Sequence, residues 1–259
     1  QRSNHNKPHR KMIAENPILA LLAGAAAGGF INGLAGFGIA LMALAIWLQV
    51  MPSQQAVPIV AVLAVVTGFQ GLWLVRRDVV RWPGRAMRFL LPALIGVPVG
   101  TALLLAVSET TIRLVIAAIM LAYGGFFTLG RSVPRIHGPT PVIDTLVGLA
   151  GGVMGGAAGL SGVLPTMWCA LRPWPRNETR AVLQVFNQVI LTASAILFAW
   201  RGLYTPRVLL MAAISLPVAV IAAQAGIVIF RRLSDDLFRR LLIWTLFGSG
   251  ILIALREMF

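Results

Sequence analysis

GAAAGGFINGLAGFG (residues 24–38) and GLAGGVMGGAAGLSG (residues 148–162) are two stretches built almost wholly from Gly, Ala and bulky apolar residues. Together they contain half of the chain's 26 glycines. Shifting the second stretch by one position relative to the first aligns them without a gap, and the aligned glycine pairs include Gly28 and Gly151, Gly33 and Gly156, and Gly36 and Gly159. A duplicated half of the chain is the simplest cause of this similarity.

The composition excludes a soluble domain. The chain is 58% hydrophobic and 12% charged, with a mean hydropathy of +0.84, whereas about a quarter of the residues in soluble domains are charged. Long, continuous apolar segments rich in Leu and Ala favour membrane-crossing helices over strands. We therefore predict an all-α integral membrane protein with eight apolar segments. They are residues 17–51, 54–75, 89–107, 112–129, 141–171, 181–200, 208–230 and 237–255.

The similarity between the two halves extends beyond the glycines. The tripeptide QAV beginning at Gln55 is matched by RAV beginning at Arg180, and Pro92 is matched by Pro217, at a nearly constant offset. We therefore predict two homologous repeats of four segments each. The predicted organisation is a polar, basic N-terminal segment at 1–16, a first transmembrane repeat at 17–130, a linker at 131–140 and a second transmembrane repeat at 141–259.

The first segment of each half is too long for one straight crossing of the membrane. Residues 17–51 would form a helix of about 50 Å at 1.5 Å per residue, so we expect a break at 33–38 and another at 156–162, where glycine tolerates positive φ. A re-entrant hairpin gives three crossings per half and inverted repeats, whereas a kink gives four crossings and parallel repeats. The distribution of Lys and Arg fits both topologies. Hairpins are favoured because they keep the arginine-dense loops between helices cytoplasmic.

The leading glycines of each stretch have GxxxG spacings, as at Gly29 and Gly33 and at Gly148 and Gly152. This spacing allows two helices to pack closely. The leading glycines are therefore predicted to pack helices together, and the same faces permit a homodimer.

The charge and the reactive residues exclude several function classes. The net charge of +14 does not indicate nucleic-acid binding, because the basic residues lie in short connections between apolar segments, where they set topology and contact lipid. The single Cys169 excludes an internal disulfide, and the histidines (His5, His9 and His137) lie in polar segments, so no metal and no cofactor is predicted. Residues 1–15 lack the apolar core of a signal peptide. No nucleophile, base and acid cluster within the apolar segments, so the chain is not expected to be an enzyme.

The order of motifs resembles the TauE/SafE family of sulfite and organosulfonate exporters, of the 4-toluene sulfonate uptake permease type. The resemblance covers almost the whole chain: a glycine-rich first helix, an AV pair, a basic loop and a third helix carrying Pro92, Gly96, Pro98 and Gly100. The chain departs from the family's glycine run, because the first repeat lacks the proline that follows it and the second has Ser161 in place of a glycine. The resemblance implies a multi-pass protein of the bacterial inner membrane that exports sulfite or an organosulfonate such as sulfoacetate.

Polar residues inside the membrane are costly and therefore need a reason. Four of them lie at i, i+3, i+4 and i+8 on one face of segment 181–200: Gln184, Asn187, Gln188 and Thr192. Amide and hydroxyl donors can replace part of the hydration of an oxyanion, so this stripe is a candidate substrate site. The alternative is that these side chains form hydrogen bonds between helices.

Further candidates lie in the first repeat and at the two breaks. Thr67 and Gln70 share one face of segment 54–75, and Gln55 and Arg180 occupy matching helix starts, where packing or interfacial roles are the alternatives. At the breaks, a new helix N-terminus would offer backbone N–H groups to an anion. The residues expected to contribute there are Gly36, Gly38, Gly159 and Gly162, with Asn32 and Ser161 as side-chain donors.

The acidic residues all lie at or near the ends of segments, and Asp144 is interpreted as a helix-start residue rather than a proton carrier. An exported anion needs no proton carrier, since each negative charge leaving a negative interior gains about 2.3 kcal/mol per 100 mV. The predicted mechanism is export of a small sulfur oxyanion, driven by the membrane potential, from a midplane site between the repeats. An anion channel and an uptake permease for another small anion are the alternatives.

Overall fold

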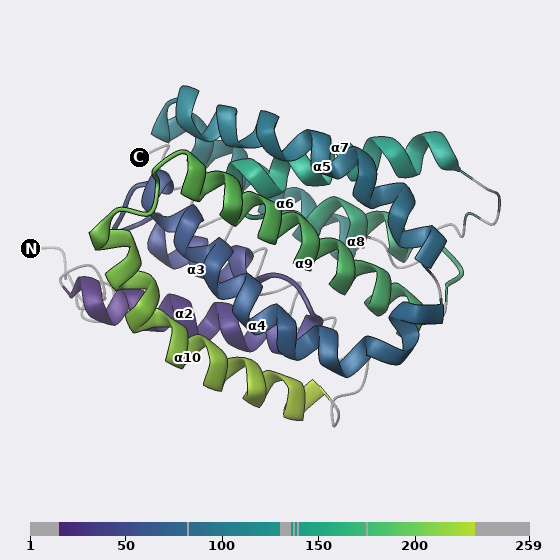
Figure 1. Ribbon diagram of the computed structural model, residues 1–259, viewed down its shortest axis with the longest axis horizontal. Helices are drawn as coiled ribbons and strands as arrows, with labels where there is room; N and C mark the ends of the chain where they lie inside the picture. Colours follow the sequence, from purple (N-terminus) through teal and green to yellow (C-terminus); the bar gives the residue numbers. More distant parts are fainter. Residues whose placement is uncertain are drawn as a thin grey trace, which may run out of the picture.

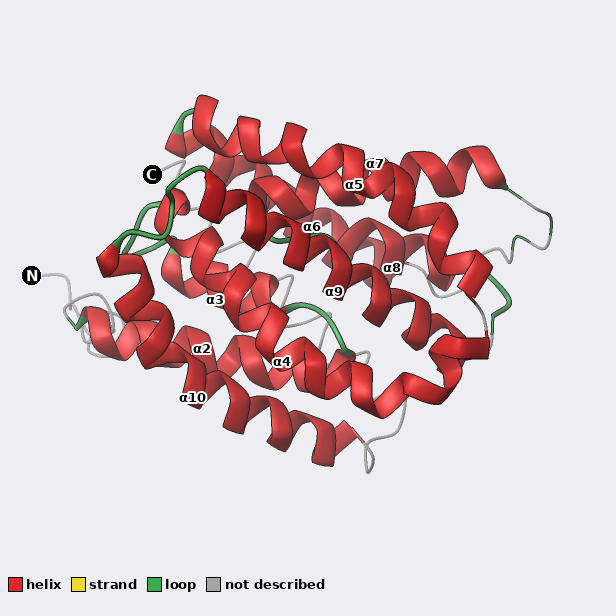
Figure 2. Ribbon diagram, viewed as in Figure 1, coloured by secondary structure: helices red, strands yellow, loops and turns green. Residues whose placement is uncertain are grey.

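The computed structural model describes residues 16–81, 83–129, 136, 138, 140–174 and 176–230, and within them the chain is helical with no strand (Figure 2). The helices are α2 (Pro17–Ala35), α3 (Ile39–Trp47), α4 (Ser53–Arg81), α5 (Pro83–Ala106), α6 (Glu109–Leu129), α7 (Pro141–Ala158), α8 (Val163–Ala170), α9 (Arg176–Trp200) and α10 (Pro206–Phe230). The last apolar segment, 237–255, the N-terminal segment up to residue 15 and most of the predicted linker lie outside the described residues.

Six of the described helices are long and apolar enough to cross a membrane. Their spans are Pro17–Ala35, Ser53–Trp73, Met87–Ala106, Pro141–Ala158, Ala181–Trp200 and Pro206–Ile229. Segment 112–129 lies in α6. The prediction of an all-α, multi-pass membrane protein is confirmed.

The helices lie side by side in a fixed order (Figure 1). Helices α5 and α7 form one edge, α2 and α10 form the opposite edge, and α9 and α4 lie between them. The pairs α5 with α7, α2 with α10, and α4 with α9 share the most extensive contacts. The two central helices therefore bring together segments from different halves of the sequence.

Both long apolar segments are broken at glycines, as predicted. Helix α2 ends at Ala35, and Gly36 and Gly38 then adopt φ of 80° and 99° before α3 begins. Helix α7 ends at Ala158, and Gly159 adopts φ of 67°. Residues with a Cβ rarely adopt such left-handed backbone conformations. Glycine therefore allows the helix to end and the chain to turn at these positions.

After each break the short helix runs back along the long one. The Trp47 indole at the end of α3 donates to the carbonyl of Leu21 near the start of α2, at 3.1 Å, and the beginning of α3 lies against Gly28, where a Cβ would be 2.8 Å from the Ile39 carbonyl. In the second segment, the Trp168 indole near the end of α8 donates to Asp144 at the start of α7, at 2.7 Å. Each break therefore reverses the direction of the chain.

Glycines form two tight seams between long helices. A Cβ on Gly29 or Gly33 of α2 would collide with the backbone of Ala219 or Ala223 on α10. The same occurs where Gly152 and Gly156 of α7 meet Ala93 and Val97 on α5. The prediction that the leading glycines pack helices is confirmed.

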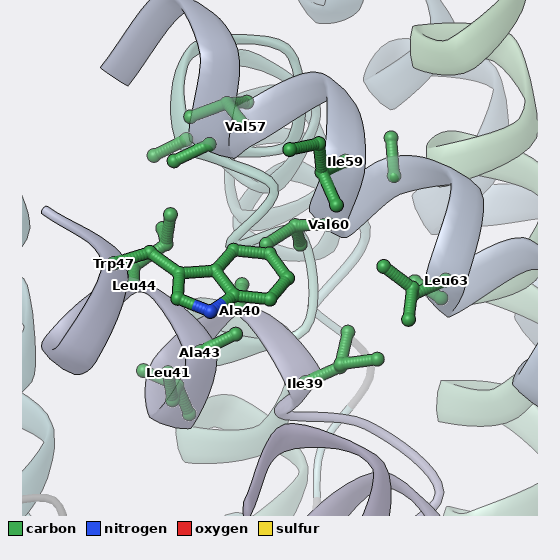
Figure 3. Packing of buried hydrophobic residues seen from close by; sticks show 14 of the residues in the cluster. Ile39, Ala40, Leu41, Ala43, Leu44, Trp47, Val57, Ile59, Val60 and Leu63 are labelled. Atoms are coloured by element: carbon green, nitrogen blue, oxygen red, sulfur yellow. The ribbon is translucent and has the colours of Figure 1, made fainter. Parts of the chain in front are cut away.

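The largest hydrophobic core lies around the short helix α3. Figure 3 shows Trp47, Ala40 and Ile39 of α3 facing Val57, Val60 and Leu63 of α4. Trp47, Ile59 and Leu63 have no more than 1% of their surface exposed, so this core is closed to solvent and lipid alike. It fixes α3, and therefore the first break, against the central helix α4.

Candidate functional site

The two glycine breaks contact each other in the middle of the helix assembly. A Cβ on Gly162 would lie 3.2 Å from Cβ of Phe37, and one on Gly159 would lie 3.0 Å from Val60 and 3.6 Å from Ala40. Residues far apart in sequence thus meet at one point beside α4. The sequence predicted each break separately but not their contact.

Each break ends in a helix N-terminus without a side-chain cap. Gly38 and Gly162 are the N-cap residues of α3 and α8, and neither cap position provides a side-chain hydrogen bond. The first residues of both helices, Ile39 and Val163, are buried. The N–H of Val163 donates to the Leu160 carbonyl at 3.3 Å. The first N–H groups of a helix have no intrahelical acceptor and carry a partial positive charge, which suits an anion.

Two buried polar pairs flank the breaks. The Ser161 hydroxyl lies 2.5 Å from Oδ1 of Asn187, which joins the second break to α9. Asn32, in the last turn of α2, donates from Nδ2 to the Thr67 hydroxyl on α4 at 2.8 Å, and Thr67 donates to the Leu63 carbonyl at 2.7 Å. All four residues of these pairs were predicted from the sequence as candidate site residues.

The predicted stripe on α9 divides into different roles. Asn187 meets the break through Ser161, whereas Gln184 and Gln188 donate across to the carbonyls of Gly68 and Val65 on α4, each at 3.1 Å. Thr192 donates to the Gln188 carbonyl of its own helix at 2.7 Å. Helical spacing identified the shared face, but the partner of each side chain depends on which helix packs there.

Gly68 and Gly71 were not identified from the sequence. A Cβ on Gly68 would collide with the side-chain oxygen of Gln188, and one on Gly71 would lie 2.7 Å from that of Gln184. These glycines make room for the two amides on the face of α4. Gly68 and Gly71 could have been identified from their i and i+3 spacing, which places them next to Thr67 and Gln70 in the sequence.

The remaining candidates lie farther from the breaks. Gln55, in the first turn of α4, and Gln70 are half-buried, and the side-chain oxygen of each has no partner within the described part of the chain. Arg180 lies in the second turn of α9, and its side chain is outside the description. These residues are not brought into the contact between the breaks by any described hydrogen bond.

A buried ion pair joins the start of α7 to the residues that follow α8. Arg172 Nη2 lies 3.4 Å from Oδ1 of Asp144, and both side chains are 5% exposed. Arg172 Nη1 donates to the carbonyls of Ile136 and Gly138 at 3.2 and 2.6 Å, and its Nη2 also donates to the Thr140 hydroxyl. The interpretation of Asp144 as a helix-start residue is confirmed, but its pairing with Arg172 was not anticipated.

The described residues contain no group of three or more His, Cys, Asp or Glu side chains that could hold a metal ion. The polar atoms gathered at the breaks are amides, hydroxyls and backbone N–H groups. These groups can hold an anion without forming a covalent bond to it.

Comparison with known proteins identifies the family. The chain matches the family described as "Sulfite exporter TauE/SafE" over residues 20–253. It is 27% identical over 245 residues to a protein of Cupriavidus necator named "Probable sulfite/organosulfonate exporter TauE", covering 90% of this chain and 92% of that relative. No solved structure matches the chain. The resemblance seen in the sequence is confirmed: the chain belongs to the TauE/SafE family, whose members are membrane transporters rather than enzymes.

Proposed function

We propose that this protein exports a small sulfur oxyanion, sulfite or an organosulfonate such as sulfoacetate, through a site where the two glycine breaks meet. The observation that carries this proposal is the contact between two uncapped, buried helix N-termini, with the Ser161 and Asn187 pair beside them. Backbone N–H groups at helix ends bind oxyanions in many proteins. Broken helices that direct their N-termini at a substrate are also typical of secondary transporters.

The chemistry of this region suits a substrate that must be released again. The side chains that flank the breaks are amides and hydroxyls: Asn32, Thr67, Ser161 and Asn187. Neutral donors replace part of the hydration of an anion without the strong attraction of a buried charge. Such a site binds an oxyanion on one side of the membrane and can release it on the other.

We further propose that the chain consists of two repeats, at 17–130 and 141–259, joined by the linker at 131–140 and related by inverted topology. Equivalent glycines make equivalent contacts with the opposite half, and this reciprocity supports the proposal. The equivalent pairs are Gly29 with Ala219 and Gly152 with Ala93, Gly33 with Ala223 and Gly156 with Val97, and Gly226 with Phe30 and Gly100 with Val153. The reversal of the chain after each break supports re-entrant hairpins rather than kinks.

Substitution of the pair beside the second break tests the site. In proteoliposomes loaded with sulfite, Asn187→Ala and Ser161→Ala should each reduce efflux about tenfold, the effect of losing one buried hydrogen bond to a charged ligand. Ser194→Ala is the matched control, since the Ser194 hydroxyl is equally buried but donates to Ile190 in its own helix. If both site variants, reconstituted in equal amounts, show wild-type efflux, the breaks do not form the transport site.

The driving force is tested by imposing a membrane potential on the same vesicles. Efflux of sulfite should accelerate when the interior is made negative, because each exported negative charge then gains about 2.3 kcal/mol per 100 mV. An efflux rate that does not change with the membrane potential would contradict export driven by the potential. Saturation at millimolar sulfite with slow turnover distinguishes this transporter from an anion channel. Inward accumulation of sulfite without efflux from a negative interior would indicate an uptake permease.

A further inference from the structure

We infer that the transported anion carries a hydrogen-bond donor of its own, as hydrogensulfite and hydroxy- or amino-substituted sulfonates do. This inference rests on the proposed function and concerns the chemistry of its substrate. It comes from three buried amide oxygens around the middle of α4 that have no hydrogen-bond partner among the described residues: Asn32 Oδ1, Gln184 Oε1 and Gln188 Oε1. Their side chains belong to residues that are 3%, 1% and 6% exposed.

The orientation of these amides is fixed by their partners. A carbonyl oxygen can only accept a hydrogen bond, so the ends of Gln184 and Gln188 that face the carbonyls of Gly68 and Val65 are the NH₂ groups. Thr67 uses its hydroxyl proton on the Leu63 carbonyl, so the end of Asn32 that faces Thr67 is also its NH₂ group. A flip of either glutamine would oppose two acceptors, and a flip of Asn32 would do so as long as Thr67 donates to Leu63. The three free atoms are therefore acceptors that require a donor.

The free acceptors lie close to the proposed site. Asn32 and Gln188 contact α4 at Thr67 and Gly68, which are adjacent residues, from α2 on one side and α9 on the other. Val60 of the same helix contacts the second break at Gly159. Asn32 lies one turn before Gly36 at the first break, and Gln188 follows Asn187, which bonds Ser161 at the second break. The acceptors of Asn32 and Gln188 therefore lie beside the breaks, and that of Gln184 lies one turn farther along α9.

This arrangement favours a substrate with both kinds of hydrogen-bonding group. The helix N-termini offer donors to the oxygens of the anion, and the amide oxygens accept from a hydroxyl or ammonium group. A buried acceptor without a partner is unfavourable, and a site that contains one discriminates against a ligand that leaves it unpaired. An anion of the same size and charge that lacks a donor should bind at least about tenfold more weakly.

Pairs of isosteric anions test this inference at one fixed, slightly acidic pH. Hydrogensulfite is compared with methanesulfonate, and isethionate is compared with propane-1-sulfonate, each as a competitor of radiolabelled sulfoacetate efflux from proteoliposomes. The members of each set share the monoanionic sulfur group and differ in the presence of a donor. We expect the donor-bearing member of each comparison to compete at least tenfold better. Preference in the first set alone assigns inorganic hydrogensulfite, and preference in the second assigns a substituted sulfonate.

Two variants locate the preference. Asn32→Leu and Gln188→Leu keep most of the side-chain volume but remove the acceptor. Each should therefore bring the selectivity ratio, which is the inhibition by the donor-bearing anion divided by the inhibition by the anion without a donor, toward one. The ratio is internal to each preparation and does not depend on how much protein folds. Thr101→Val is the control, because the Thr101 hydroxyl is buried and donates to Val97 in its own helix.

The outcomes separate the two proposals. Equal competition by methanesulfonate and hydrogensulfite, or a wild-type selectivity ratio in both leucine variants, would overturn the inference while leaving sulfite export intact. Failure of the wild-type protein to transport or bind any of these anions would instead overturn the proposed function.

Discussion

Gly33→Ala and Gly152→Ala should each strongly destabilise the folded protein. At both positions a Cβ would collide with a backbone carbonyl of the facing helix, that of Ala223 for Gly33 and that of Ala93 for Gly152. A backbone atom cannot move aside as a flexible side chain can, so the two helices must separate and lose their packing along the whole seam. Overpacking of a well-packed core costs about 1 to 3 kcal/mol and occasionally more. We expect the larger values here, measured as loss of the monodisperse peak in detergent and a lower unfolding temperature.

Gly125→Ala is the matched control for these seam variants. Gly125 also lies within a helix, α6, but a Cβ there would meet nothing within 4 Å. Alanine is favoured over glycine in a helix by about 1 kcal/mol, so this variant should be as stable as the wild type or more stable. Wild-type unfolding temperatures for Gly33→Ala and Gly152→Ala would show that the seams can open at little cost.

Arg172→Met should destabilise the protein by about 3 to 5 kcal/mol, the cost of removing one partner from a buried ion pair. The substitution would leave the Asp144 carboxylate buried without its cation, and it would remove the donors to the carbonyls of Ile136 and Gly138. Trp168 and Thr140 would still donate to Asp144, at 2.7 and 3.1 Å. The measurement is the free energy of unfolding in a mild detergent.

A second substitution distinguishes the ion pair from simple loss of packing. Asp144→Asn in the Arg172→Met background removes the uncompensated charge while keeping an oxygen for the Trp168 indole, so the double variant should recover part of the lost stability. Arg201→Ala, at an exposed position in the connection after α9, is the control and should change stability by less than about 0.5 kcal/mol. A double variant less stable than Arg172→Met would contradict the role assigned to the pair.

The helices and their breaks could be predicted because their causes are local. Continuous apolar runs require helices in a membrane, and Gly36, Gly38 and Gly159 allow a conformation that other residues disfavour. The excess length of residues 17–51 already required an interruption, and the glycines indicated where it falls. The helical spacing of Gln184, Asn187 and Gln188 likewise placed them correctly on one buried face.

The contacts that assemble the site could not be predicted, because they depend on which helices become neighbours. Nothing near Phe37 in the sequence indicates that it will lie against Gly162. Gln188 and Thr192 share a face, yet Gln188 reaches across to α4 while Thr192 bonds within α9. Arg172 belongs to a loop, and only the reversal after the second break carries it back to Asp144. Local rules determine the elements, whereas packing determines the partners.

Each edge of the protein pairs a helix from the first half of the sequence with a helix from the second half, and this pairing has a consequence for synthesis of the protein. Helix α2 is made first among the described helices, but the backbone that fills its glycine face belongs to α10, which is made last among them. A nascent chain that ends before Pro206 therefore holds α2 with its close-packing face uncovered. The seam between α2 and α10 forms only after nearly the whole described chain has entered the membrane, so insertion must be almost complete before this edge of the protein can acquire its final packing.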